Sequence, residues 1–361
     1  MLSRIVAALC CSLALAPASA RERCPDAFPA AADIRALGWS ADGLAELKRA
    51  AQEIGSAALL VVTNAQLVLE HGDAARPLPV RSIRKSLLGA MIGQAAEEGL
   101  MSLDAPLSSF SGVDLSELTD DEKKARLRDL LASRSGVYLP AAAETADAAA
   151  SRPARGSHPP GSHWHYNNWD FNAAGTIFEA QTGETVFAAF ERRIAAPLCM
   201  QDYQAEAGAY SFLRNFWGVK QSPFPAYHFK MSARDLTRFG ELHLRKGVWG
   251  GRQIVPEGWV AESTRAISPT PEPIFNHYGY MWWVAGAQDD ASRRRLGLTA
   301  GLPAGSFAAA GYGGQWLIVI PAWDTVIAHL TDTGGLLGGD VLSADEKIRL
   351  FNGIVAARVG S

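Results

Sequence analysis

The stretch RSIRKSLLGAMIGQAAEEG (residues 81–99) decides how the rest of the chain is interpreted. It places Ser82 and Lys85 three positions apart, at the start of an apolar segment that stops at Gly99. Residues three apart on a helix share a face, so these two side chains are expected to meet. Apolar residues fall on nearly every side of the predicted helix, which indicates that the helix is buried.

A serine hydroxyl becomes a good nucleophile only when a nearby base accepts its proton. Lysine can be that base if burial disfavours its charged form, and the N–H groups at a helix start can stabilise developing negative charge. The chain has eight lysines, and Lys85 is the only one with a serine three residues before it. Taken alone, the pair could still be a helix-starting serine followed by a solvated lysine.

A second group of polar residues occurs in SHWHYNNWD (162–170), where Tyr166 and Asn168 form the only Tyr-x-Asn of the chain. A tyrosine phenol can relay a proton, and an asparagine amide can orient a substrate carbonyl or a lysine. Packing of aromatic residues in a loop is the alternative interpretation.

Three histidines near this segment, His158, His163 and His165, allow a rival hypothesis of a metal-dependent hydrolase. His-x-His spacing can serve a metal, but no carboxylate or cysteine partner follows at a recognisable spacing. The sequence therefore favours no metal and no cofactor.

A third group is AAGYGGQWLIVIP (309–321), with glycines at 311, 313 and 314 beside an apolar strand. Glycines at such a strand edge allow close approach of a ligand or of another backbone, and the edge could offer an N–H to an oxyanion. A plain hairpin turn or β-bulge explains the same residues equally well.

Strand patterns lie toward both ends of the chain and helix patterns fill its middle, which predicts an α+β fold with an antiparallel sheet built from both ends. The sheet region is expected over about 21–80 and 275–361, and the mostly helical region over about 81–274. The expected strands are two joined near Asn64-Ala65 (57–73), then 278–285, 306–321 and 325–332. The other expected helices are 123–136, two split at Gly183 (167–198), 232–247 and 343–359, with a surface excursion at 140–160 and a polar arm before the first strand.

The bulk properties narrow the class of protein. Residues 1–20 carry Arg4, a short apolar core and a small-residue end at Ala20, a pattern typical of a secretory signal peptide. A periplasmic or secreted product (21–361) is therefore expected, without stable membrane insertion. In an oxidising compartment Cys24 and Cys199 could form a disulfide or stay as thiols. The net charge of −3, with the charges interspersed, argues against nucleic-acid binding, and no sequence pattern indicates an oligomeric state.

Familiar motifs of other enzyme classes are missing from the sequence. No Gly-x-Ser-x-Gly occurs, so the nucleophile elbow of α/β-hydrolases is absent. No Walker-type loop and no dinucleotide-binding fingerprint after a strand is present either.

The order Ser-x-x-Lys, Tyr-x-Asn and a glycine-rich strand resembles the serine β-lactamase and penicillin-binding-protein superfamily. The likeness is greatest to its class C-like branch of esterases, D-aminopeptidases and 6-aminohexanoate-dimer hydrolases. It extends over nearly the whole chain after residue 20, through SIRKS, HYNNWDFNAAG, SARDLTRFGELHLRKG and YGYMWWV.

The resemblance implies residue roles. Ser82 would be the acylated nucleophile, Lys85 its proton acceptor and Tyr166 a shared base that protonates the leaving group. Asn168 would hold the substrate or Lys85. The oxyanion would be held by the N–H of Ser82 and one from the third-motif strand, near Gln315.

The third motif departs from the family pattern. Penicillin-recognising members have Lys-Thr-Gly or His-Thr-Gly there, whereas this chain has Tyr312-Gly313-Gly314 with no cation. The resemblance therefore implies a small ester or amide as the substrate rather than a β-lactam or a D-Ala-D-Ala peptide, with slow β-lactamase activity at most. A penicillin-binding-like sensor with little turnover is the alternative of another class.

Overall fold

The computed structural model describes residues 28–212, 222–287, 297–298, 301–334 and 341–359. Within them, the main sheet has eight antiparallel strands. In spatial order they are β2 (Gln66–Gly72), β1 (Ser56–Thr63), β14 (Thr325–Thr331), β13 (Gln315–Ile320), β12 (Phe307–Gly311), β11 (Trp283–Val284), β10 (His277–Tyr278) and β9 (Ser268–Pro269). Because β1 pairs with β14, the sheet is built from both ends of the chain, as predicted.

The β1–β2 hairpin forms where the sequence predicts it. Asn64 and Ala65 connect the strands, and both have a positive φ, 49° and 55°. Positive φ at both positions of a two-residue loop gives a turn whose twist matches that of the flanking strands.

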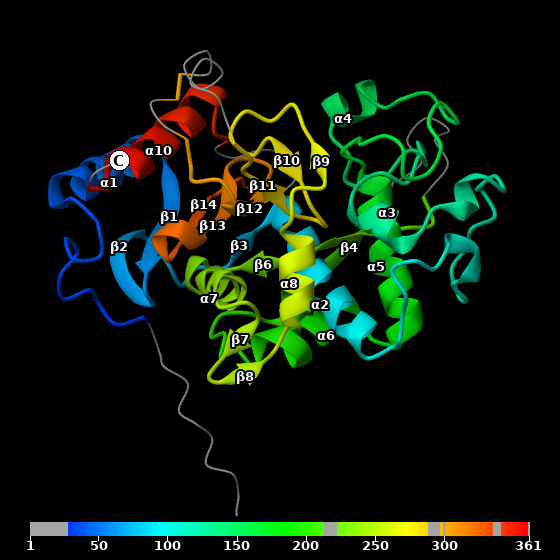
Figure 1. The fold of residues 1–361 in the computed structure, drawn as a ribbon, viewed down its shortest axis with the longest axis horizontal. Helices are drawn as coiled ribbons and strands as arrows, with labels where there is room; N and C mark the ends of the chain where they lie inside the picture. The colour runs from blue at the N-terminus through cyan, green and yellow to red at the C-terminus, as the bar shows by residue number, and fades with distance from the viewer. Residues whose placement is uncertain (1–27, 213–221, 288–296, 299–300, 335–340, 360–361) are drawn as a thin grey trace, which may run out of the picture.

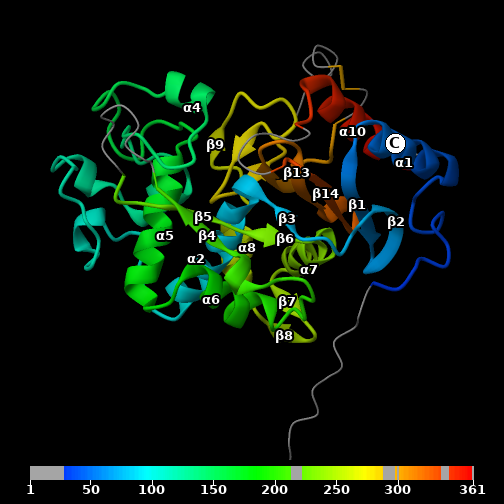
Figure 2. The same ribbon diagram turned by 180° about the vertical axis from the view of Figure 1, so that it is seen from behind.

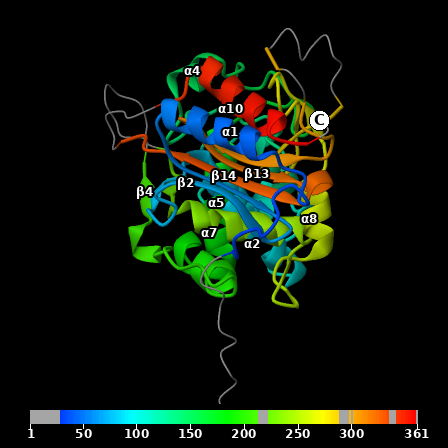
Figure 3. The ribbon, with the colours of Figure 1, turned by 90° about the vertical axis from the view of Figure 1, so that its left-hand side faces the viewer.

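Helices cover both faces of the sheet. Figure 3 shows α1 (Ala41–Glu53) and α10 (Ala344–Ala356) on one face, and α7 (Ala233–Leu244) and α2 (Arg84–Glu97) on the other. The side chains of β1 alternate accordingly: Leu59 and Val61 join the core under α1 and α10, and Leu60 joins the core on the opposite face. This two-residue alternation is the expected pattern of a sheet buried on both sides.

The helical region extends beyond the β9 edge of the sheet, on the side away from β2 (Figures 1 and 2). It contains α3 (Leu127–Leu131), α4 (Ala146–Ala150), α5 (Asn168–Thr182), α6 (Val186–Phe190) and α8 (Glu257–Ser263). Short two-stranded sheets are formed by β3 (Leu78–Pro79) with β6 (Lys230–Met231), β4 (Ala209–Ser211) with β5 (Ala226–His228), and β7 (Val248–Trp249) with β8 (Arg252–Gln253).

Several predicted helices are confirmed with their boundaries. Ser232 caps α7 by accepting a hydrogen bond from the N–H of Asp235, and Gly183 ends α5 in the left-handed conformation. Gly99, just beyond α2, also has a positive φ of 72°. These boundaries agree because capping residues act locally.

The prediction of one helix over 123–136 is wrong. Only a 3₁₀ turn (Glu122–Lys124) and the short α3 form, separated by extended backbone at Ala125 and Arg126. The segment ends early because Ser133 has a φ of 55° and bonds the loop before α5. Tertiary hydrogen bonds here override local helix propensity.

Two further expectations need correction. The single strand over 278–285 is instead the tight hairpin of β10 and β11, in which Met281 has a φ of 61°. The polar arm before β1 contains α1, which is capped by Ser40 and buries Leu44 and Leu47 at helical spacing. Among the described residues, no helix combines the length and apolarity needed to cross a membrane.

Candidate active site

Ser82 lies in a 3₁₀ turn, η1 (Arg81–Ile83), that leads directly into α2. Arg81 has a φ of 53°, a left-handed conformation that non-glycine residues rarely adopt. The helix that follows is buried on nearly all sides, as its sequence predicts. A rigid, buried helix therefore holds Ser82 at its N-terminal end.

Lys85 connects Ser82 to Tyr166. Its Nζ lies 2.6 Å from the Oγ of Ser82 and 2.8 Å from the Oη of Tyr166. The side chain of Lys85 is only 1 % exposed. Burial lowers the pKa of Lys85 well below its usual value, and the neighbouring Arg84 lowers it further. The lowered pKa favours the uncharged amine, and this amine lies within hydrogen-bond reach of the serine hydroxyl.

Tyr166 is half-buried, with its ring stacked on Trp283 at 5.3 Å between centroids. Burial raises the pKa of Tyr166 to about 12, although its hydrogen bond with Ser82 and the charge of Arg84 oppose this shift. The phenol is therefore protonated at neutral pH and can donate or relay a proton.

The backbone around Tyr166 is fixed by buried polar contacts. Ser133 Oγ donates to the carbonyl of His165 and accepts from the N–H of Asn167. Asn167 caps α5 and its amide also donates to the buried carboxyl of Asp170, which accepts a further hydrogen bond from Ser135 Oγ at 2.5 Å. The position of the phenol is therefore fixed by hydrogen bonds to the neighbouring backbone and by the stacking of its ring on Trp283.

A cavity of about 770 Å³ opens beside Ser82 and Tyr166. Its wall is mainly apolar, as is usual for small-molecule sites. Besides Tyr166 and Tyr312, the aromatic lining consists of Trp164, Trp283, Trp316, Phe275 and Phe351. The charged lining residues and the histidine are Arg81, Arg84, Glu144, His228, Glu272 and Lys347. The cavity therefore lies between the helical region, the end of β12 and α10.

The third-motif residues have different positions around this cavity. Tyr312 lines it together with Ala310 and Gly311, and its side chain is 58 % exposed. Gly313 and Gly314 form the turn between β12 and β13, with φ values of 88° and 102°. Gln315 is fully buried, and its amide bonds the backbone and hydroxyl of Thr331, outside the cavity lining. The strand end closest to Ser82 is thus Gly311-Tyr312.

Asn168 lines the cavity at the first position of α5. Its Nδ2 donates to the carbonyl of Ala143, and its buried Oδ1 has no hydrogen-bond partner among the described residues. The amide is therefore oriented by the 140–160 excursion. An asparagine held in this way can contact a substrate polar group.

The three histidines are engaged with other groups. His158 and His163 stack with ring centroids 3.9 Å apart, and His158 Nδ1 lies 3.1 Å from the hydroxyl of Tyr138. His165 packs edge-on against Tyr138. Within the described ranges, no group of three or more His, Cys, Asp and Glu side chains is arranged to hold a metal ion.

Cys199 follows the π-helical turn Glu191–Ala195 and is disulfide-bonded. Cys24 and the signal-peptide residues lie outside the described residues. The pairing of Cys24 with Cys199 and the cleavage at Ala20 therefore stay predictions.

Sequence reasoning missed two residues of the site. Arg84, inside the Ser-x-x-Lys segment, is 2 % exposed and lines the cavity. Asp170, four residues after Tyr166, is buried and anchors the loop. A charged residue within a buried helix pattern was the available signal for Arg84.

Comparisons with known proteins agree with this fold. A solved structure described as "Putative 6-aminohexanoate-dimer hydrolase from Bacillus anthracis" matches with a TM-score of 0.60 and 21% identity, covering 86% of this chain and 80% of that chain. EstCE1, a hydrolase with promiscuous acyltransferase activity, matches with a TM-score of 0.62 and 14% identity, covering 89% and 98%. An uncharacterized protein of Alkalihalophilus pseudofirmus is 25% identical over 286 residues, 74% of this chain and 77% of that protein.

At these identities the solved structures establish the fold alone. The sequence profile of the Beta-lactamase family matches residues 41–347, which include Ser82, Lys85, Tyr166 and Asn168. This chain belongs to the Beta-lactamase family.

Proposed function

We propose that this protein hydrolyses a small ester or amide through an acyl-enzyme on Ser82. The observation that carries the proposal is the continuous contact of Ser82, Lys85 and Tyr166, with the lysine buried and its pKa lowered. Neutral amines in such a position are competent bases at ordinary pH.

In the proposed reaction, Ser82 Oγ attacks the substrate carbonyl carbon while its proton passes to Lys85 Nζ. The tetrahedral oxyanion is held by the N–H of Ser82 and by an N–H at the Gly311-Tyr312 strand end. When the bond to the leaving group breaks, that group takes a proton from Tyr166, which regains one from Lys85. Water then attacks the acyl-enzyme along the same proton path and releases the acid.

The favoured substrates are esters and amides rather than β-lactams. Tyr312-Gly313-Gly314 supplies no cation, and the aromatic wall of the cavity fits an apolar acyl or leaving group. β-Lactamase or D-Ala-D-Ala carboxypeptidase activity is the alternative within the same chemistry, and a penicillin-binding-like sensor is the alternative without turnover. We further propose that the chain is exported after cleavage at Ala20, which N-terminal sequencing of the exported product would test.

The test is covalent labelling. The full chain is incubated with a fluorophosphonate and, in parallel, with p-nitrophenyl esters of short acids, and intact mass and turnover are measured. We expect one adduct and measurable turnover for the wild type, none for Ser82→Ala, and wild-type behaviour for Ser162→Ala, an exposed serine whose hydroxyl bonds Pro159.

Three outcomes separate the alternatives. Equal labelling of Ser82→Ala would refute the assignment of the nucleophile. Adduct formation without turnover would favour the sensor. Faster turnover of a chromogenic cephalosporin than of any ester would favour a β-lactamase.

A further inference from the structure

The nucleophile helix contains a second buried cation, Arg84. Its side chain is 2 % exposed, and its Nη2 donates to the Oδ1 of Asn172 on α5 at 2.9 Å. The guanidinium carbon lies 4.3 Å from the centre of the Tyr227 ring on β5. Its Nη1 is buried and has no hydrogen-bond partner in the described part of the chain. Neutral groups alone hold this charge.

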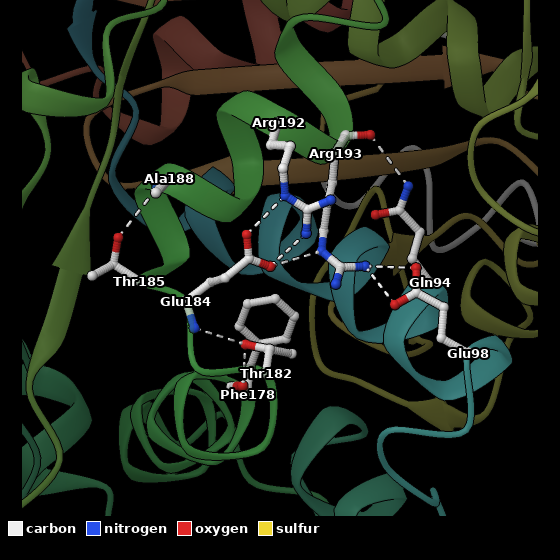
Figure 4. A network of polar contacts seen from close by, with 9 residues as sticks. All are labelled: Gln94, Glu98, Phe178, Thr182, Glu184, Thr185, Ala188, Arg192 and Arg193. Carbon is white, nitrogen blue, oxygen red and sulfur yellow. Dashed lines mark hydrogen bonds and ion pairs between the residues drawn. The ribbon is translucent and has the colours of Figure 1, made fainter. Parts of the chain in front are cut away.

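The half-buried Arg193 shows how unusual this arrangement is. The side chain of Arg193 is 8 % exposed, and it lies between Glu98, at 2.8 Å, and Glu184, at 3.4 Å (Figure 4). Buried charges are normally paired in this way, because an uncompensated charge in a low-dielectric interior is costly. No described carboxylate pairs with Arg84. The free-energy cost of leaving Arg84 without a carboxylate partner suggests that its charge has a role in the function.

Arg84 and Lys85 are adjacent in the chain and lie in the same low-dielectric environment. A fixed positive charge there disfavours a second positive charge on Lys85 much more strongly than it would in water. Resting on the function proposed above, we propose that Arg84 is a positioning residue of the reaction, which keeps Lys85 in the amine form that accepts the serine proton.

The other titratable groups around Lys85 do not supply this effect. Burial raises the pKa of Tyr166 and of Tyr278, and burial lowers the pKa of His228 to about 4, so all three are uncharged at neutral pH. Burial likewise raises the pKa of Asp170 and of Glu272.

The other arginine in the described cavity lining is Arg81. It is half-buried, and its guanidinium donates to Thr333 Oγ1 and to the carbonyl of Gly334. Because Arg81 is partly solvated, its field at Lys85 is screened more than that of Arg84. Arg84 is thus the permanent charge with the strongest influence on the base.

The test measures the pH dependence of fluorophosphonate labelling at Ser82, which reports the ionisation of the base in the free enzyme. In Arg84→Met the charge is lost, so Lys85 binds its proton more tightly. We expect the midpoint of the acidic limb to rise by about one pH unit, with labelling about tenfold slower below it and restored at high pH.

A second variant keeps the proposal testable if Arg84→Met does not fold. Asn172→Asp leaves Arg84 on the Tyr227 ring but places a carboxylate against its guanidinium, so the field at Lys85 is cancelled and the midpoint is expected to rise as well. Arg193→Gln is the control, since it removes a half-buried arginine outside the cavity lining, and its midpoint is expected to equal that of the wild type.

A midpoint that stays within about 0.3 pH units of the wild-type value in Arg84→Met and in Asn172→Asp would overturn the proposal. So would a labelling rate that falls by the same factor at every pH, which is the signature of a purely structural role. Absence of wild-type labelling would instead refute the proposed function, so the two failures are distinguishable.

Discussion

The buried Lys85 has a measurable effect on stability, which Lys85→Met isolates. Burial lowers the pKa of this amine well below its usual value in the folded protein, so we expect the amine to be without its proton at neutral pH. In the unfolded chain a lysine has a pKa of about 10.4 and is charged at neutral pH. Methionine fits the same volume and does not titrate. Lys85→Met is therefore expected to abolish labelling of Ser82. Its free energy of unfolding is expected to increase relative to that of the wild type as the pH falls.

The magnitude follows from proton linkage. Between the unfolded pKa of lysine and the lowered folded pKa, unfolding of the wild type takes up one proton. Lowering the pH by one unit in this window thus lowers the free energy of unfolding of the wild type by about 1.4 kcal/mol relative to the variant. The two hydrogen bonds lost from Nζ, to Ser82 and Tyr166, cost the variant about 1 kcal/mol each. That cost does not change with pH.

The assay is denaturant unfolding of both proteins at pH 7, 8 and 9, with the difference in free energy of unfolding plotted against pH. We expect the difference to change by about 2.7 kcal/mol from pH 9 to pH 7, in favour of the variant. Lys124→Met is the control, because Lys124 is exposed and its bond to Asp121 raises its pKa, so both states keep the proton over this range. A pH-independent difference for Lys85→Met would show that folded Lys85 is charged and would refute this reasoning.

Two further predictions concern the loop that carries the phenol. Tyr166→Phe keeps the ring against Trp283 but removes the hydroxyl, and it is expected to slow fluorophosphonate labelling about 100-fold or more with little change in denaturation midpoint. Asp170→Ala removes the acceptor of Ser135 Oγ and of the Asn167 amide, so urea unfolding should show a loss of about 3 kcal/mol. An unchanged midpoint in Asp170→Ala would mean that these donors find other partners.

Local patterns carry much of this structure. The β1–β2 turn, the Ser232 cap and the end of α2 near Gly99 depend on residues close in sequence, and each is where the sequence predicts it. The spacing of Ser82 and Lys85 predicts their contact for the same reason. Helix geometry alone brings residues three apart together.

Local sequence patterns do not predict contacts between segments that are far apart in the chain. The contact of Tyr166 with Lys85 spans 81 residues, and only the order of motifs in the resembling family pointed to it. The unpaired charge of Arg84 depends on Asn172 and Tyr227, which no spacing rule brings near it. The 123–136 segment has helical propensity, but the helix ends early because Ser133 forms hydrogen bonds with the loop before α5. In each case packing between separate segments decides the outcome.

The pairing of β1 with β14 also determines when the protein can become active. The hydrogen bond between Ser56 and His329 spans 273 residues, so the sheet closes a very long loop. Strands that are far apart in the sequence pair slowly, because closing the long loop between them costs chain entropy before the stabilising contacts form. The cavity wall combines η1 from early in the chain with α10 from late in it. A nascent chain therefore presents Ser82 without a substrate cavity, and hydrolysis has to wait for the last strand to dock.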